Sequence, residues 1–228
     1  SADYLASLAR FCREHDIHLI FDEIVTGMGR VGDYTRAGQL GVVPDMITLG
    51  KGITSGYVPM SAVAVHERVY AALRDHTSAE RALGLGSTND GHALATAAAS
   101  AVLEVLEEEQ IFDNVRRRSE QLRAGLEALR DKHPELKHVR GTGLIQGLEF
   151  GDADGAPWSI SQANRLRIAV EARGVLVSSL RAAPQIMLVP PLVITSEDVE
   201  EIVAALDGAI VDVREGRRPA KGYARAMG

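Results

Sequence analysis

The sequence predicts an α/β protein with a mostly parallel sheet. Short apolar runs typical of buried strands alternate with amphipathic helical segments along the first half of the chain. Loops rich in glycine, or carrying a proline, separate these segments. Alternating strands and helices are the pattern of a parallel sheet whose strands are joined by helices.

The first part of the chain supplies this alternation. A helix is predicted over 3–15 because Leu5, Leu8, Phe11 and Cys12 recur at the spacing of one helical face. The elements that follow are a strand at 17–21, a glycine-rich loop at 26–32, a short helix at 33–40, strands at 46–49 and 61–65, and a helix at 66–74.

From Asp90 the pattern becomes helical, and 112–132 is strongly amphipathic. Pro134 ends that helix, so we predict a large domain over 1–118 and a smaller α+β domain over 119–228. The elements expected in the smaller domain are strands at 143–150, 175–179 and 185–189, and helices at 159–173 and 196–211, the last capped by Ser196.

Composition excludes several classes of function. The net charge of -6 argues against a nucleic-acid-binding surface. No stretch reaches the ~20 apolar residues that a membrane span requires. The single cysteine, Cys12, suits a reducing compartment and is expected to be a buried structural thiol, so we predict a cytoplasmic protein. No metal site is predicted.

The candidate chemistry lies at the ends of two predicted strands. Asp22 and Glu23 close an apolar run, and Lys51 stands between two glycines just after the strand at 46–49. Taken singly, an acidic pair after a strand has a structural role by default, and most lysines are solvated surface charges. Together they suit a pyridoxal phosphate enzyme, in which a lysine forms a Schiff base and an acid keeps the pyridine nitrogen protonated.

At these residues the sequence resembles the class III (omega-type) aminotransferases, which are fold type I pyridoxal phosphate enzymes. The resemblance rests on 19–32, which reads Leu-Ile-Phe-Asp-Glu-Ile-Val-Thr-Gly-Met-Gly-Arg-Val-Gly, and on 41–59 around Leu49-Gly50-Lys51-Gly52. Weaker similarity follows at Thr88, at 139–144 and at 190–195. The resemblance implies part of a large cofactor-binding domain followed by a smaller C-terminal domain.

The resemblance also implies roles for individual residues. Lys51 is similar to the Schiff-base lysine that shuttles a proton between substrate and cofactor, and Asp22 to the partner of the pyridine nitrogen. Ile24 would face the same way as Asp22 along the strand and resembles the apolar residue packed on one face of the ring. Glu23 would point to the opposite side, where an ion pair or a hydrogen bond is expected.

Further positions are similar to residues that bind phosphate or substrate. Ser87 and Thr88 resemble the segment whose threonine binds the cofactor phosphate across a dimer interface. The sequence departs from the family around them, with Leu85-Gly86, Asn89 and Ala93 in place of histidine-glycine, tyrosine and proline. For the substrate carboxylate the candidate is Arg181, because Ser178 occupies the usual arginine position; a surface loop arginine is the alternative. Arg140 is expected in a structural turn, and His92 at the start of a helix.

Family members carry a long segment ahead of the Asp22 strand, which provides a phosphate-binding loop and the aromatic residue on the other ring face. We therefore expect this chain to act with a partner chain that supplies the N-terminal half, as a split enzyme or as a fragment of one. The predicted function is transfer of an amino group from an amine or omega-amino acid to a keto acid. The alternatives are an aminomutase or decarboxylase of the same fold, or a non-catalytic assembly subunit.

Overall fold

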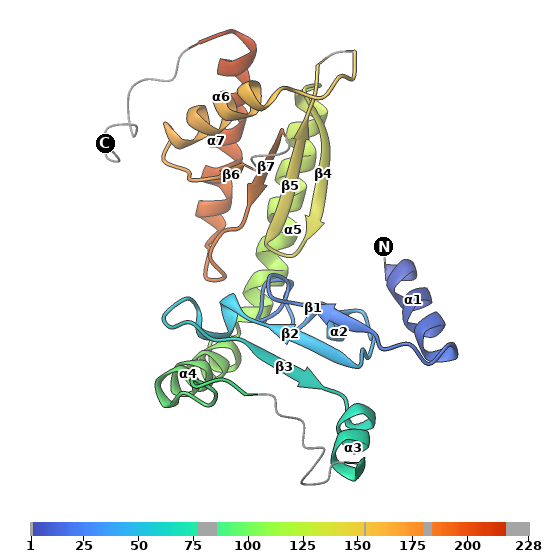
Figure 1. The fold of residues 1–228 in the computed structure, drawn as a ribbon. Helices are drawn as coiled ribbons and strands as arrows, with labels where there is room; N and C mark the ends of the chain where they lie inside the picture. The colour runs from blue at the N-terminus through green and yellow to red at the C-terminus, as the bar shows by residue number, and fades with distance from the viewer. Residues whose placement is uncertain (1, 77–85, 153, 180–183, 218–228) are drawn as a thin grey trace. The chain divides into compact units, whose positions relative to one another are not determined.

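The computed structural model describes residues 2–76, 86–152, 154–179 and 184–217, and its architecture is mixed α/β (Figure 1). The chain divides into two compact units, the first ending at Phe112 and the second beginning at Asp113. This division falls near the start of helix α5 (Ile111–Lys132). The boundary predicted from the sequence, after residue 118, lies further along the same helix.

The first unit is built on a three-stranded sheet with the order β1-β2-β3. Its elements are α1 (Ala2–Glu14), β1 (Ile20–Asp22), α2 (Arg36–Gln39), β2 (Met46–Leu49), the 3-10 helix η1 (Lys51–Thr54), β3 (Ala62–Val65), α3 (Glu67–His76) and α4 (Ala93–Glu108). Strands β1 and β2 are parallel, and α4 packs against η1. Strand β2 has the bounds that the sequence predicts, 46–49.

The expectation of a mostly parallel sheet is wrong for β3, which runs antiparallel to β2. A parallel neighbour requires a crossover connection, usually an α-helix. The segment from Gly50 to Ser61 contains only η1, and Ser55 and Gly56 then take left-handed backbone angles of φ 50° and 82°. The chain reverses here instead of crossing over, and the sheet becomes mixed.

The first unit buries a small core and leaves one sheet face open. Cys12 packs in the core with Leu19 and Val42, as predicted for a structural thiol. On the sheet, the register places Ile20 with Met46 and Val65, and Asp22 with Thr48 and Val63. Ile20 is 55% exposed and Val63 58%, so an apolar face lies open beside Asp22.

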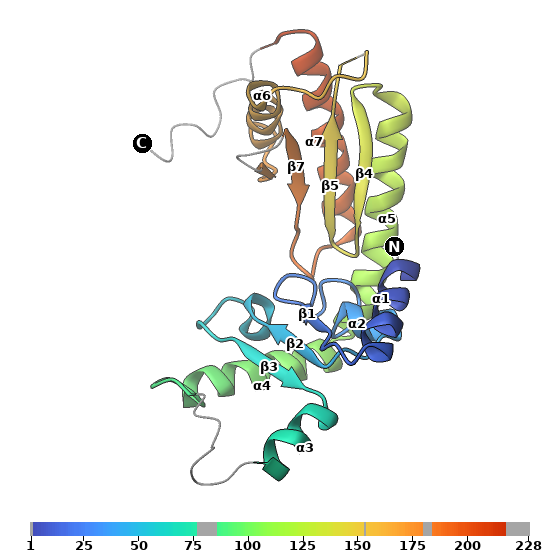
Figure 2. The same ribbon diagram turned by 45° about the vertical axis from the view of Figure 1, so that its right-hand side comes forward.

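In its described residues, the second unit is an antiparallel sheet of order β4-β5-β7-β6 with three helices. Its elements after α5 are β4 (Leu136–Thr142), β5 (Ile145–Phe150), α6 (Ile160–Glu171), β6 (Ser178–Ser179), β7 (Gln185–Leu188) and α7 (Ser196–Arg214). In Figure 1, α5 lies behind β4 and β5, and in Figure 2, α7 lies behind β5. Leu122 and Leu126 of α5 are fully buried, as their helical spacing predicts.

Three features of the second unit differ from the sequence expectations. Strand β6 is limited to Ser178–Ser179, instead of the expected 175–179. Strand β4 occupies the segment expected to form a turn around Arg140. The sequence does not predict this strand, because only Leu136 and Val139 are buried and the polar residues between them interrupt the alternation typical of a strand. Helix α7 is capped by Thr195 and not by Ser196: the Thr195 hydroxyl accepts from Asp198 N, and the Asp198 side chain accepts from Thr195 N. Arg140 therefore lies in a strand and not in the expected turn, and its exposed side chain forms an ion pair with Glu149 at 3.1 Å.

Candidate active site

Asp22 and Lys51 lie at the carboxyl ends of two neighbouring parallel strands. Asp22 is the last residue of β1 and pairs in register with Thr48 of β2, and Lys51 follows Thr48 by three positions. Polar groups at this edge of a parallel pair are where α/β proteins place their ligands. The tertiary structure thus brings together the two strand ends that the sequence marks.

The Asp22 carboxylate is exposed, and its orientation is set by hydrogen bonds to one of its two oxygens. Its Oδ1 accepts hydrogen bonds from the Ile24 backbone N–H and from the Thr48 hydroxyl, both at 3.1 Å. Such an arrangement presents an anion at the strand end while a hydroxyl and an amide set its direction.

Glu23, the next residue, is buried and structural. It is only 2% exposed, and its carboxylate accepts from the Thr26 hydroxyl at 2.5 Å, from Arg36 N at 2.9 Å and from Ala37 N at 2.7 Å. A carboxylate at the first turn of α2 satisfies backbone N–H groups that have no partner within the helix. The prediction of a hydrogen-bonding role for Glu23 is confirmed.

Ile24 lies beside the backbone that leads into Lys51. Strand β1 ends at Asp22, so strand alternation does not extend to Ile24. A Cβ added at Gly50 would lie 3.4 Å from Ile24 Cγ2, which places the Ile24 side chain against Gly50. Ile24 is half-buried and therefore offers an apolar surface next to the lysine.

Lys51 opens η1 in a strained backbone conformation. Its φ is 43°, in the left-handed region that costs an L-residue roughly 1–2 kcal/mol. The lysine side chain is exposed. Strain of this kind persists where the surrounding structure imposes it, and it is concentrated at functional sites.

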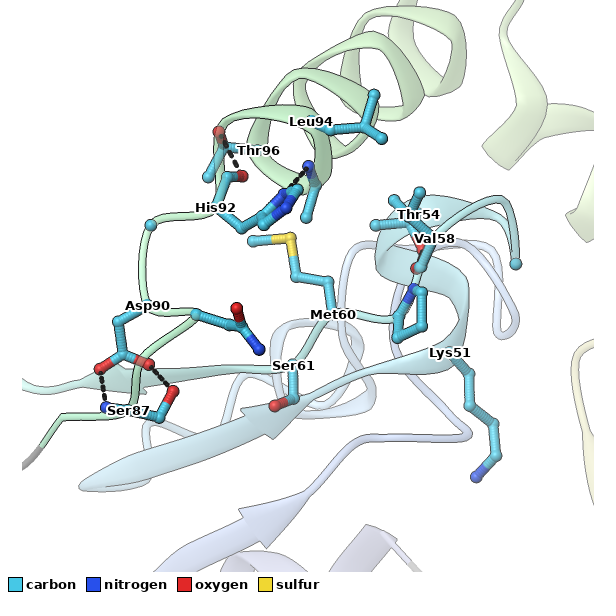
Figure 3. A pocket seen from close by; sticks show the side chains of 15 residues that line it. Lys51, Thr54, Val58, Met60, Ser61, Ser87, Asp90, His92, Leu94 and Thr96 are labelled. Carbon is cyan, nitrogen blue, oxygen red and sulfur yellow. Dashed lines mark hydrogen bonds between the residues drawn. The ribbon is translucent and has the colours of Figure 1, made fainter.

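A hollow of about 1110 Å³ lies beside Lys51 within the first unit. Residues after η1 and residues at the start of α4 line it, among them Met60, Ser61, Ser87 and His92. Figure 3 shows Ser87 on one side of the hollow and Lys51 on the other, with the Lys51 amine directed away from Met60. Asp22 does not line this hollow.

Within the described residues, no three or more His, Cys, Asp or Glu side chains form a group that could hold a metal ion. No helix in that part of the chain is both long and apolar enough to cross a bilayer.

Comparison with known proteins assigns the family. The model of the class-III aminotransferases matches residues 1–210. The chain belongs to the class-III aminotransferases. Membership implies pyridoxal phosphate as the cofactor, and Asp22 and Lys51 suit that group.

Relatives and solved structures agree with this assignment. An uncharacterized aminotransferase of Sinorhizobium fredii is 35% identical over 216 residues, which cover 93% of this chain and 46% of the relative. The taurine–pyruvate aminotransferase of Bilophila wadsworthia is 32% identical over 222 residues, 94% of this chain and 49% of the relative. A pyridoxal-phosphate-bound amine transaminase from an uncultivated Pseudomonas species superposes with a TM-score of 0.88 at 34% identity, covering 93% of this chain and 48% of that one. The chain spans about half the length of these three proteins.

The structure places the segment predicted to bind phosphate in a loop that precedes α4. The Ser87 hydroxyl donates to Asp90 Oδ1 at 2.6 Å, and the Ser87 N–H donates to Asp90 Oδ2 at 2.8 Å. Both hydrogen bonds lower the pKa of Asp90, the one from the hydroxyl most. Thr88 is exposed and does not line the hollow beside Lys51. His92 caps α4 by accepting from Ala95 N, in agreement with its predicted place at the helix start.

Arg181, predicted to bind a substrate carboxylate, lies outside the described residues. Ser178, which the resemblance places at the usual arginine position, belongs to strand β6 at the edge of the described sheet.

Two residues at the site were not predicted from the sequence. Thr48 reaches Asp22 across a strand pair, a contact that depends on the register of the sheet. Asp90 accepts hydrogen bonds from both the hydroxyl and the backbone N–H of Ser87. The signal in the sequence is the spacing Ser-Thr-Asn-Asp, in which an acid follows a serine by three positions, as in a capping turn.

Proposed function

We propose that this chain is the cofactor-anchoring part of an aminotransferase that moves an amino group from an amine or omega-amino acid to a keto acid. The observation that carries the proposal is the placement of Asp22 and Lys51 at the same ends of two parallel neighbouring strands. Membership of the class-III aminotransferases supports the same reaction class.

When bound, pyridoxal phosphate supplies an electron sink that stabilises negative charge on a substrate carbon. Lys51 would be the covalent anchor of the cofactor and, once released, would move the proton to and from the substrate carbon. Asp22 would hold the proton on the ring nitrogen through its exposed carboxylate. Ile24, packed against Gly50, would offer an apolar contact to one face of the ring.

Phosphate binding is assigned to Ser87 and Thr88. Thr88 is the better placed of the two, because its side chain is exposed while both donors of Ser87 are engaged by Asp90. Since Thr88 does not line the hollow beside Lys51, we assign it to the site of a second copy of the chain, which makes the active species a dimer. Arg181 is retained as the candidate for the substrate carboxylate, and the cytoplasm as the compartment.

The open sheet face supports a partner chain that supplies the rest of the enzyme. Ile20, Val63 and Val65 are exposed on the face that also carries Asp22. Exposed apolar residues on one sheet face are typical of a surface that another part of a protein covers. Relatives about twice as long as this chain supply such a part.

The test is amino-group transfer by the chain assembled with its complementary half. Wild type should convert an amine and pyruvate to alanine, and Lys51→Ala should abolish this, whereas the control Lys137→Ala should retain it. An unchanged rate in Lys51→Ala would show that the chain is a non-catalytic subunit. Release of CO₂, or an amine shifted within one substrate, without alanine formation would identify a decarboxylase or an aminomutase.

A further inference from the structure

The two oxygens of the Asp22 carboxylate differ in their hydrogen bonds. Oδ1 accepts two hydrogen bonds, from Ile24 N and from the Thr48 hydroxyl, each at 3.1 Å. In the described part of the chain, the structure shows no hydrogen bond to Oδ2. One oxygen is therefore held by the protein, and the other is left as an open acceptor.

Thr48 is placed to hold this orientation rigidly. It is paired with Asp22 in the register of β1 and β2, so both side chains stand on the same face of the sheet. The Thr48 carbonyl also accepts from Glu23 N at 3.0 Å, which fastens the two strands next to the Asp22 side chain. The Thr48 hydroxyl itself donates to Asp22 Oδ1, so the hydroxyl is the group that sets the direction of the carboxylate.

We propose that Thr48 is a positioning residue for Asp22: it fastens Oδ1 so that Oδ2 faces the protonated ring nitrogen of the cofactor. This inference rests on the proposed function. A hydrogen bond between a charged donor and a carboxylate is short and directional, so its strength depends on where the accepting oxygen points. Residues that orient a ligand-binding group in this way affect ligand affinity without touching the ligand.

The alternative is that Thr48 is an ordinary strand residue, since threonine favours strands. Two substitutions separate these roles because they change shape and hydroxyl independently. Thr48→Val keeps the branched shape and strand preference but removes the hydroxyl. Thr48→Ser keeps the hydroxyl and loses the branch. A strand residue would tolerate valine at least as well as serine, whereas a positioning residue would tolerate serine better.

The experiment measures cofactor binding in the chain assembled with its complementary half. Pyridoxal phosphate affinity is obtained by absorbance titration, and the pH dependence of the absorbance of the bound cofactor is recorded for each variant. We expect Thr48→Val to weaken affinity by about tenfold, the equivalent of one charge-assisted hydrogen bond, and to shift the pH profile. Thr48→Ser should stay within about twofold of wild type. The melting temperature of the cofactor-free assembly should be the same in all three.

Asp22→Asn separates failure of this inference from failure of the proposed function. If Asp22→Asn weakens binding while Thr48→Val binds like wild type with an unchanged pH profile, Thr48 does not position Asp22 and the inference is overturned. If Asp22→Asn also binds like wild type, the proposed role of Asp22 is wrong as well. Thr48→Ala is a second variant without the hydroxyl, and it should reproduce the loss if the valine protein does not fold.

Discussion

The Ser87 hydroxyl and the Asp90 carboxylate lie 2.6 Å apart, and the Ser87 backbone N–H donates to the other oxygen of the same carboxylate at 2.8 Å. An acid therefore occupies donors in the loop that is predicted to bind the cofactor phosphate. A phosphate approaching Thr88 would meet this negative charge.

Neutralising Asp90 should strengthen cofactor binding. Asp90→Asn keeps an oxygen that accepts from Ser87 and removes the charge, so the affinity for pyridoxal phosphate should rise roughly two- to fivefold at low salt. Absorbance titration at two salt concentrations measures this, with Asp75→Asn as a control for the change in net charge. Weaker binding in Asp90→Asn would mean that the carboxylate shapes the phosphate site instead of opposing it.

Asp45 should make the protein sensitive to acid. The Arg68 guanidinium, followed by the Leu19 backbone N–H, holds the pKa of this buried carboxyl at about 2, below the ordinary 3.8. Because the folded-state pKa is depressed, its stabilising effect is complete above about pH 4 and is lost as the pH falls toward 2. Asp45→Asn should lower the free energy of unfolding by about 1–3 kcal/mol at pH 7. Urea unfolding from pH 7 to pH 2 should show the two proteins converging in acid; a constant difference would contradict this.

Glu23→Gln should destabilise the protein although the shape is almost unchanged. All three partners of the buried carboxylate are donors, so an amide NH₂ in place of one oxygen would face another donor. We expect a loss of about 2–3 kcal/mol in the free energy of unfolding. The matched control is Glu104→Gln at an exposed position of α4, which should stay within about 0.5 kcal/mol of wild type. Equal stability of the two variants would show that Glu23 does not organise the loop.

The two glycines around the site should respond differently to alanine. A Cβ at Gly27 would lie 2.7 Å from the Glu23 carbonyl oxygen, whereas a Cβ at Gly50 would make an ordinary contact at 3.4 Å with Ile24. Gly27→Ala should therefore lower the free energy of unfolding by about 1–3 kcal/mol through backbone displacement, and Gly50→Ala should be nearly neutral. Thermal unfolding of both variants compares them directly, and a greater loss in Gly50→Ala would refute the packing argument.

Local sequence patterns predicted the strand ends that carry the site and several of the buried helix residues. The apolar run before Asp22 and the glycines around Lys51 identify the two strand ends, and β2 has its predicted bounds at 46–49. Helical spacing predicts the burial of Cys12 in α1 and of Leu122 in α5, whereas Phe11, expected on the same face as Cys12, is 50% exposed. These features depend on residues close together in the chain, where periodicity and local geometry act.

Only the tertiary structure decided how these segments pair. Strand β3 reverses because Ser55 and Gly56 turn the chain, and β4 forms although its pattern of burial is weak. The hydrogen bond from Thr48 to Asp22 joins residues 26 positions apart. Strand register is set by pairing with a distant segment and by burial of a shared face. The sequence therefore indicates Asp22 and Lys51 as site residues, but it does not show that Thr48 orients Asp22.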